Sequence, residues 1–345
     1  MNSRRTFCHT TCALAACGLL PGALGRAAMA ADLVRVTIAV PGPGNLLFLP
    51  ITLAQKIGAD KDEGIELDIR YVSGGPVAFR DMLDRNTDFA AGGLAALGLQ
   101  RLNGKPVVCV APTTRVPAYT LLVRSDLKSK VRKIADLAGL VVGVKGHVPG
   151  GRSTSQLFTE YVLAQAGVTA DRVNYVPVGQ AYDSQHAALA SGTVDAIMGD
   201  EPFASRLVRE KVAYILADYH DLTTTRKQMG GLFLNGHIAT REDFIAARPD
   251  VVGKMVGSIK RSLAWIDRHS ATEMVTALAI SDREESAAML GALKANKHIY
   301  SPDGRLSTEQ IDSVTRFFRN TETASAAKNF DMASIVNTRW AGSAP

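Results

Sequence analysis

Cysteine is scarce in this chain. Three of its four cysteines fall within the first thirty residues, which leaves Cys109 as the only one in the rest of the sequence. One cysteine cannot form an intramolecular disulfide, so a disulfide-stapled fold is excluded for the chain after residue 30. Cys109 lies in the apolar run 106–110, and we expect it to be a small buried hydrophobe.

The sequence also lacks the familiar motifs of catalysis and metal binding. It contains no H-E-x-x-H, G-x-S-x-G or G-x-x-x-x-G-K-S/T pattern, and its seven histidines show no metal-ligand spacing. Cys109 lies in a predicted strand rather than at a helix start beside a histidine, where a nucleophilic thiolate is expected. We therefore expect no catalytic residue, no metal and no cofactor.

The first thirty residues have the pattern of an export signal. Arg4 and Arg5 precede Phe7 and a short apolar run, and the segment 28–30 matches an A-x-A cleavage site. The paired arginines favour twin-arginine export, with an ordinary secretory signal as the alternative. The segment 14–17 also resembles a lipoprotein signal, which would be lipidated at its cysteine, Cys17. We expect an exported, periplasmic protein.

After this segment the chain has little excess charge and no long apolar run. The segment carries Arg4, Arg5 and Arg26 and no acid, so removing it lowers the formal net charge from +6 to +3, which is too slight to indicate nucleic acid. No later apolar run is long enough to span a membrane. The remaining length suits two domains of about 150 residues, with enough apolar content for two cores.

Two segments about a hundred residues apart share one plan. In 83–93 and in 189–203 a helix ends, a turn follows, and an aspartate, Asp88 or Asp195, opens a short strand of small apolar residues that stops at glycine. A strand tip that ends in glycine lets a ligand approach backbone N–H groups. The repeat predicts two similar α/β lobes, each with such a tip.

Short strands and helices alternate along most of the chain, which is typical of mainly parallel sheets. Helices are predicted at 46–57, 77–83, 94–102 and 153–167, and the strands at 33–40, 65–72, 88–91, 107–111, 119–123, 140–144, 173–178 and 194–198. Capping patterns predict further helix starts at 281–284 and 307–310. A helix after Pro249 is predicted to bury the stripe Val252, Met255, Val256, Ile259, Leu263 and Ile266.

The predicted elements divide the chain into an export signal and two lobes. After the signal at 1–30, we expect the first part of lobe 1 at 31–118 and lobe 2 at 119–220. The segment 221–345 would cross back to lobe 1 and end in C-terminal helices.

Seven short segments occur in an order along the chain that resembles the solute-binding proteins of the nitrate, taurine and aliphatic-sulfonate class of ABC importers. That family also includes binders of thiamine precursors. The resemblance implies a two-lobe periplasmic-binding-protein type II α/β fold, with the ligand in a cleft between the lobes and an importer permease as partner. We expect a monomer. The segments are 53–56 with 63–67, 83–92, 104–107, 121–124, 134–144 and 189–203.

Strand ends and helix N-termini would converge on the cleft and favour an anion. Arg152 could pair bidentately with a carboxylate or sulfonate, or be a solvated loop arginine. The hydroxyl residues could bind ligand, cap a helix, or both. Lys145 and His147 are secondary candidates. The predicted ligand contacts are Asn45, Gly92, Gly93, Thr113, Gly151, Arg152, Ser153, Thr154, Tyr182 and Glu201.

The expected ligand is a small organic anion, such as a sulfonate, a carboxylate or a related group, and aromatic and zwitterionic anions are among the candidates. Glu201 would repel a carboxylate unless it faces an amine on the ligand or a cation of the protein, or it could serve the hinge instead. Phe48 and Tyr182 could sandwich an aromatic ring, or belong to the core. The alternatives are a neutral ring compound as ligand, or an enzyme or a sensor domain on the same fold.

Overall fold

The computed structural model describes residues 33–145, 151–321 and 325–344. All of them lie in the unit Leu33–Pro345. The predicted export signal, the lipidation candidate Cys17 and the secondary candidate His147 lie outside the described residues. In the part that is described, no helix has both the length and the apolar character needed to cross a membrane.

The first sheet has five strands in the order β2-β1-β3-β10-β4. Strand β1 pairs in parallel with β2 and β3, while β10 runs antiparallel to both β3 and β4. Strand β4 is buried along its whole length, as a strand covered on both faces requires. The strands are β1 (Val34–Pro41), β2 (Ile65–Val72), β3 (Phe89–Gly93), β4 (Val107–Pro112) and β10 (Gly236–Arg241).

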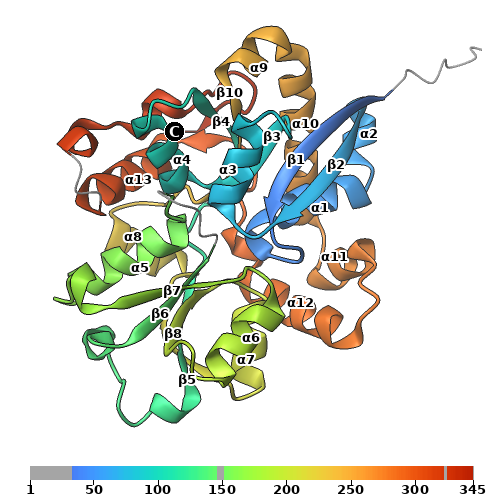
Figure 1. Ribbon diagram of the computed structural model, residues 1–345. Helices are drawn as coiled ribbons and strands as arrows, with labels where there is room; N and C mark the ends of the chain where they lie inside the picture. The colour runs from blue at the N-terminus through green and yellow to red at the C-terminus, as the bar shows by residue number, and fades with distance from the viewer. Residues whose placement is uncertain (1–32, 146–150, 322–324, 345) are drawn as a thin grey trace, which may run out of the picture. The chain divides into compact units, whose positions relative to one another are not determined.

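The second sheet repeats this plan in the order β7-β6-β8-β5-β9. Strand β6 pairs in parallel with β7 and β8, and β5 runs antiparallel to β8 and β9. Each sheet therefore combines parallel strands with one reversed strand, and Figure 1 shows each flanked by helices. The strands are β5 (Thr120–Arg124), β6 (Val141–Lys145), β7 (Asn174–Val178), β8 (Ala196–Gly199) and β9 (Ala213–Asp218).

The repeated sequence segments form corresponding strands of the two sheets. Strands β3 and β8 each lie beside the parallel strand that precedes them, β1 or β6. The Asp88 carboxylate accepts the Thr37 N–H of β1 at 2.9 Å, and the Asp195 carboxylate accepts the Val141 N–H of β6 at 2.9 Å. The aspartates thus anchor equivalent strands, which is the physical reason for the repeat.

Helices cover the first sheet and its surroundings. Helix α10 begins at Pro249, and its predicted stripe is buried, since each of the six side chains is at most 1% exposed. The helices are α1 (Leu49–Lys56), α2 (Ala59–Asp62), α3 (Gly75–Leu83), α4 (Leu94–Leu102), α9 (Glu242–Ala247), α10 (Pro249–Arg268), α11 (Ala271–Leu278), α12 (Arg283–Asn296) and α13 (Thr308–Thr321).

The second sheet is accompanied by α5 (Thr154–Gln165), α6 (Tyr182–Ala190), α7 (Phe203–Arg209) and α8 (Leu222–Met229). Ser153 caps α5, because its Oγ accepts the Gln156 N–H at 3.2 Å. The predicted cap at 281–284 is wrong by one residue. Asp282 caps α12 and accepts the Glu285 N–H at 2.7 Å, because its carboxylate is the acceptor that reaches that N–H.

The buried apolar side chains form two clusters, and these clusters do not correspond to the two sheets. The larger includes Val36 of the first sheet and Val142 of the second, while the smaller contains Leu122 and Ile197 of the second sheet alone. Within the larger cluster, the Phe158 ring of α5 packs on several aromatic rings from other parts of the chain. Those rings are Tyr119, Tyr219, Phe233 and Phe317, at centroid distances of 4.9 to 6.1 Å. Cys109 is buried, as expected.

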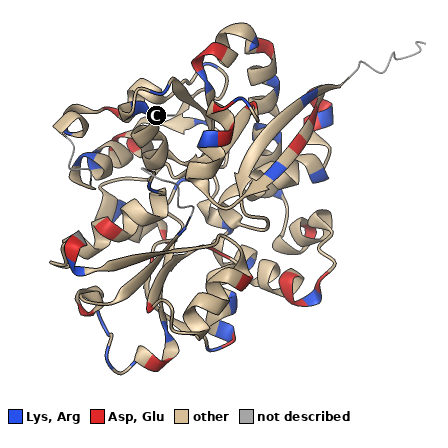
Figure 2. Ribbon diagram, viewed as in Figure 1, with Lys and Arg blue, Asp and Glu red and all other residues tan. Residues whose placement is uncertain are grey.

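Charged residues surround these sheets. Figure 2 shows Lys and Arg interspersed with Asp and Glu on the helices and loops around both sheets. The strands β4 and β8 carry no charged residue. Among the buried charged residues are Lys145, the last residue of β6, and Asp200, directly after β8.

Candidate ligand-binding site

A small cavity, called the inner cavity below, lies where strand ends of both sheets meet the start of α5. Its volume is about 30 Å³, enough for one water-sized molecule. It is lined by Pro41, Asn45, Leu47, Phe48, Gly75, Gly92, Gly93, Ala96, Tyr119, Lys145, Ser153, Thr154, Ser155, Gln180 and Asp200.

Glycine is required at the end of β3 because other groups approach its backbone closely. A Cβ on Gly93 would lie 2.3 Å from Thr154 Oγ1 and 2.7 Å from Asn235 Oδ1. A Cβ on Gly92 would lie 2.3 Å from the Phe79 ring. The glycines that end the first repeated segment therefore make room for α5 and for the side chains under the cavity.

The start of α5 is bonded to helix α4 through a hydroxyl group. Thr154 Oγ1 accepts the Ala96 N–H at 3.0 Å, and Ala96 belongs to the first turn of α4. A first-turn N–H has no partner within its own helix, so Thr154 satisfies a group that would otherwise be unpaired. Ser153 Oγ caps α5 and lies 3.0 Å from Ser155 Oγ.

A buried ion pair forms the polar centre of the inner cavity. Lys145 Nζ lies 2.5 Å from Asp200 Oδ2, and the two side chains are 3% and 2% exposed. Burial lowers the pKa of Lys145, and the adjacent Asp200 carboxylate opposes that shift. The same Oδ2 accepts from Gln180 Nε2 at 2.6 Å and from Asn45 Nδ2 at 3.1 Å.

The other carboxylate oxygen of Asp200, Oδ1, lacks such partners in the part of the chain that the structure describes. Asp200 Oδ1 is buried and has no hydrogen-bond partner among the described residues. A buried carboxylate oxygen without a donor is costly, and such an atom in a binding cavity indicates a group that a ligand can satisfy. The cavity thus offers one cation that is already paired and one acceptor that is open.

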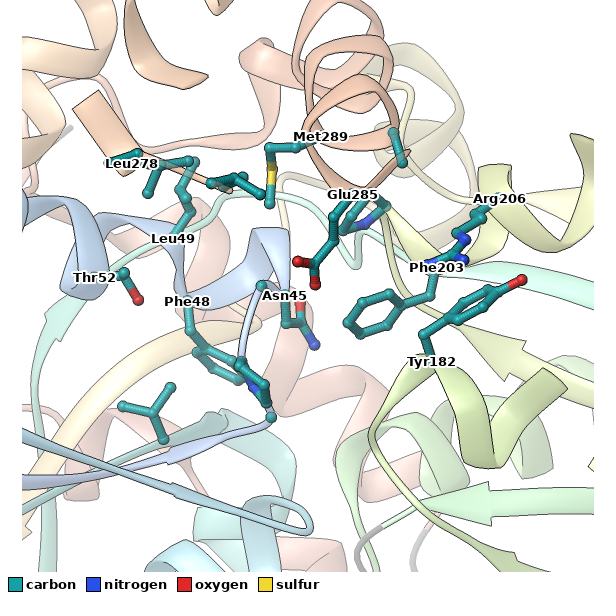
Figure 3. A pocket seen from close by; sticks show the side chains of 18 of the residues that line it. Asn45, Phe48, Leu49, Thr52, Tyr182, Phe203, Arg206, Leu278, Glu285 and Met289 are labelled. Atoms are coloured by element: carbon teal, nitrogen blue, oxygen red, sulfur yellow. The ribbon is translucent and has the colours of Figure 1, made fainter. Parts of the chain in front are cut away.

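A second, larger pocket adjoins the inner cavity, and we call it the outer pocket. Its volume is about 260 Å³, and it shares Asn45 and Phe48 with the inner cavity. Figure 3 shows side chains that line it, and the lining residues come from β1, from α1, α6, α7, α11 and α12, and from the turns before these helices.

Comparison with known protein families shows to which family this chain belongs. The family model described as NMT1/THI5 like matches residues 45–272. The chain belongs to the NMT1/THI5-like family. The family and fold expected from the sequence are thus confirmed.

This chain is also similar to individual proteins of known sequence or structure. "Putative binding protein YtlA" of Bacillus subtilis (strain 168) is 22% identical over 273 residues, which cover 77% of each chain. A protein of known structure from Bordetella bronchiseptica RB50 is 25% identical and superimposes with a TM-score of 0.81, covering 90% of this chain and 96% of that one. The alkanesulfonate-binding protein SsuA of Xanthomonas axonopodis pv. citri, bound to MOPS, is 19% identical, with a TM-score of 0.69 and coverage of 89% and 99%.

The fold also occurs in an enzyme. The desulfurization enzyme DszB is 18% identical to this NMT1/THI5-like protein and superimposes with a TM-score of 0.61, covering 89% of this chain and 97% of that one. Fold alone therefore does not separate binding from catalysis. The described residues hold no cluster of three or more His, Cys, Asp or Glu side chains that could bind a metal.

The structure places the ten predicted ligand contacts of this family member in different surroundings. Asn45, Gly92, Gly93, Ser153 and Thr154 line the inner cavity. Tyr182 lines the outer pocket, where its hydroxyl donates to Glu210. The remaining predicted residues, Thr113, Gly151, Arg152 and Glu201, line neither space.

Thr113 and Arg152 have other partners. Thr113 Oγ1 donates to the Leu47 carbonyl at 2.8 Å and so supports the turn Leu46–Phe48, which follows Asn45. Arg152 forms an ion pair with Glu160 at 2.7 Å, along α5.

Glu201 and Asp200 show what the sequence reasoning missed. Glu201 accepts from Ser205 Oγ at 2.9 Å, its carbonyl accepts the Leu46 N–H at 2.9 Å, and burial raises its pKa. The acid that faces the cavity is its neighbour Asp200, because consecutive residues at a strand end direct their side chains differently. Gln180 and Asp200 were not predicted, and Lys145 was only a secondary candidate. The strand-end argument that selected Thr113 would have found Asp200, directly after Gly199.

Proposed function

We propose that this protein captures a small polar solute in the inner cavity and delivers it to an ABC importer outside the cytoplasm. A relative named as a binding protein and an alkanesulfonate-binding protein of the same fold support a binding role. The observation that carries the proposal is the buried Lys145–Asp200 pair with its open oxygen, in a cavity lined from both sheets. We propose a monomer that presents one face of each lobe to the permease.

The charges in the cavity narrow the class of ligand. Lys145 has three N–H donors and uses one on Asp200, so two can serve an anionic group. The N-terminus of the twelve-residue helix α5 also favours negative charge. Asp200 Oδ1 needs a donor. We therefore propose a small organic anion, sulfonate or carboxylate, that also carries an amino or hydroxyl group.

A neutral ring compound with N–H donors is the second candidate. The Lys145–Asp200 pair has no net charge, and the rings of Phe48 and Tyr119 line the same cavity. An aromatic wall favours a flat ring, and Asp200 Oδ1 could accept from a ring amino group. This candidate needs no anionic group on the ligand.

Entry of a ligand requires the two sheets to separate. The inner cavity holds about 30 Å³, which is less than any organic solute needs. Three hydrogen bonds cross between the sides of the cavity: Asn45 to Asp200, Ala96 to Thr154 and Leu46 to Glu201. Breaking these bonds admits the ligand, and remaking them would report its presence to the permease.

Thermal unfolding of the chain from Ala31 onward tests the proposal. The panel contains taurine, methanesulfonate, nitrate, benzoate and an aminopyrimidine. A ligand at a hundred times its dissociation constant stabilises the protein by about 2.7 kcal/mol, which raises the midpoint by several degrees. We expect taurine, an anion with an amino group, to outperform methanesulfonate, which has none.

Two variants test whether the thermal stabilisation by ligand arises in the inner cavity. Lys145→Met removes the cation and should abolish the taurine response. Asp200→Asn removes the open carboxylate oxygen and should reduce the taurine response to that of methanesulfonate. Lys105→Met changes an exposed loop lysine and should leave it intact. A response to the aminopyrimidine alone would replace the first candidate by the second. No response to any compound, or recovery of a chemically altered ligand, would contradict the binding role.

A further inference from the structure

The outer pocket takes no part in the function proposed above, and its chemistry differs from that of the inner cavity. Its volume of about 260 Å³ is close to the lower end of small-molecule sites, about 300 Å³. Its walls are mainly apolar and include Phe48, Phe203, Leu278, Ile280 and Met289. Such walls suit a ligand with an apolar body.

One of the two charged side chains that line the outer pocket already has partners. The Arg206 guanidinium lies 3.8 Å from the centroid of the Tyr182 ring. Its Nε lies 2.9 Å from Glu210, and its second terminal nitrogen lies 3.5 Å from Glu284. Two carboxylates thus neutralise this cation, which leaves it little attraction for an anionic ligand.

The other charged side chain of the outer pocket, Glu285, has no such ion-pair partners among the described residues. Glu285 lies in the first turn of α12, where its backbone N–H binds the Asp282 cap. Within the described part of the chain, its carboxylate makes no hydrogen bond and no ion pair. Figure 3 shows that the carboxylate points into the outer pocket, toward Asn45 and Phe203. Glu285 is therefore a solvent-exposed carboxylate at the edge of a mainly apolar pocket, and it has no counter-ion among the described residues.

We infer that the outer pocket is a second binding site, which takes a small organic cation with an apolar body. The ammonium group would lie at Glu285, and the body would pack on Phe48, Phe203 and Met289. An ammonium near an aromatic face gains cation–π stabilisation in addition to the ion pair. An anion of the same shape would be repelled by Glu285, because Arg206 is already matched by Glu210 and Glu284.

The charged groups of the two proposed sites are different, although Asn45 and Phe48 line both spaces. Lys145 and Asp200 line only the inner cavity, and Glu285 and Phe203 line only the outer pocket. Variants of the inner pair should therefore leave binding to the outer pocket unchanged. That separation lets the two proposals fail independently of each other.

Calorimetric titration of the chain from Ala31 onward with three matched probes tests the inference. The probes are 2-phenylethylammonium, the neutral 2-phenylethanol and the anionic phenylacetate. We expect the ammonium to bind about fivefold more tightly than the alcohol, as one partly exposed ion pair allows, and phenylacetate to bind most weakly. Glu285→Gln should abolish the preference for the ammonium. Glu66→Gln, which changes an exposed carboxylate on β2, should preserve it.

Three results would overturn the inference. The first is equal affinity for the ammonium and the alcohol, and the second is no binding of any probe. The third is ammonium binding that survives in Glu285→Gln but is lost in Asp200→Asn, which would place the cation in the inner cavity. Both glutamates are exposed, so neither variant should affect folding.

Discussion

Gly93 shows how much a single side chain matters at this site. Its position would place a Cβ 2.3 Å from Thr154 Oγ1 and 2.7 Å from Asn235 Oδ1, closer than atoms can approach without a shift. Thr154 is held by its bond to Ala96, and Asn235 accepts from Tyr119, so neither side chain can easily give way. The missing methyl group at Gly93 is what allows α5 to lie against β3.

The substitution Gly93→Ala should therefore lower the free energy of unfolding by about 1–3 kcal/mol, the usual cost of overpacking a buried site. Gly291→Ala is the matched control, because nothing lies within 4 Å of its Cβ position in the interior of α12. It should stabilise the protein by about 0.5–1 kcal/mol through helix propensity. Chemical denaturation measures both values, and a neutral Gly93→Ala would show that the approach is not tight.

At the scale of elements, the corresponding strands β3 and β8 are fixed by the same device. The Asp88 carboxylate accepts both N–H and Oγ1 of Thr37, at 2.9 and 2.8 Å, and its own N–H donates to the Thr37 carbonyl. Asp195 and Val141 exchange the equivalent pair of backbone and side-chain bonds in the second sheet. An aspartate at each strand start thus ties that strand to its parallel neighbour.

Replacing either anchor should weaken its own sheet. Asp88→Ala and Asp195→Ala each leave a strand N–H without its acceptor, so each should lower the free energy of unfolding by about 1–3 kcal/mol. Asp84→Ala is the control, since that aspartate is exposed at the end of α3, and its effect should stay within about 0.5 kcal/mol. Urea titrations compare the three. Equal midpoints for Asp84→Ala and Asp88→Ala would refute the anchoring role.

At the scale of the whole molecule, the contacts that cross the inner cavity hold the two sheets in their closed arrangement. The bond from the Ala96 N–H to Thr154 Oγ1 links α4, beside the first sheet, to α5. Its loss leaves a buried N–H unpaired only while the cavity is closed, because water can satisfy it once the sheets separate. Thr154 therefore favours the closed arrangement rather than the stability of either lobe.

The variant Thr154→Val should shift the protein toward the open arrangement. We expect a larger radius of gyration in small-angle scattering and about fivefold weaker ligand binding, since one hydrogen bond contributes about 1 kcal/mol. Thr159→Val is the control, because that hydroxyl donates within α5, to the Ser155 carbonyl at 2.8 Å. It should alter stability alone. An unchanged radius and affinity in Thr154→Val would show that this bond does not hold the cavity closed.

Much of the architecture follows from local sequence. Strand β2 and helix α4 occur at the predicted residues, because alternating apolar residues and a helical apolar face each have one stable backbone solution. Asp88 and Asp195 identified the repeated strands, because the anchoring bond joins residues whose types are visible in the sequence. The glycines at the end of β3 were found for the same reason, since a close approach leaves a glycine in the chain.

The centre of the site required the tertiary structure. Lys145, Gln180 and Asp200 lie apart in sequence, and only the folded chain brings Lys145 Nζ and Gln180 Nε2 to within 2.6 Å of the same oxygen, Asp200 Oδ2. The choice between Asp200 and Glu201 depends on which way each side chain leaves the strand, and that direction is set by the packing of the sheet. The larger apolar cluster, which includes Phe158, spans both sheets for the same reason. The sequence alone therefore determined the elements, their repeat and the family, whereas only tertiary structure decided which charges meet, because burial and pairing are properties of the assembled fold.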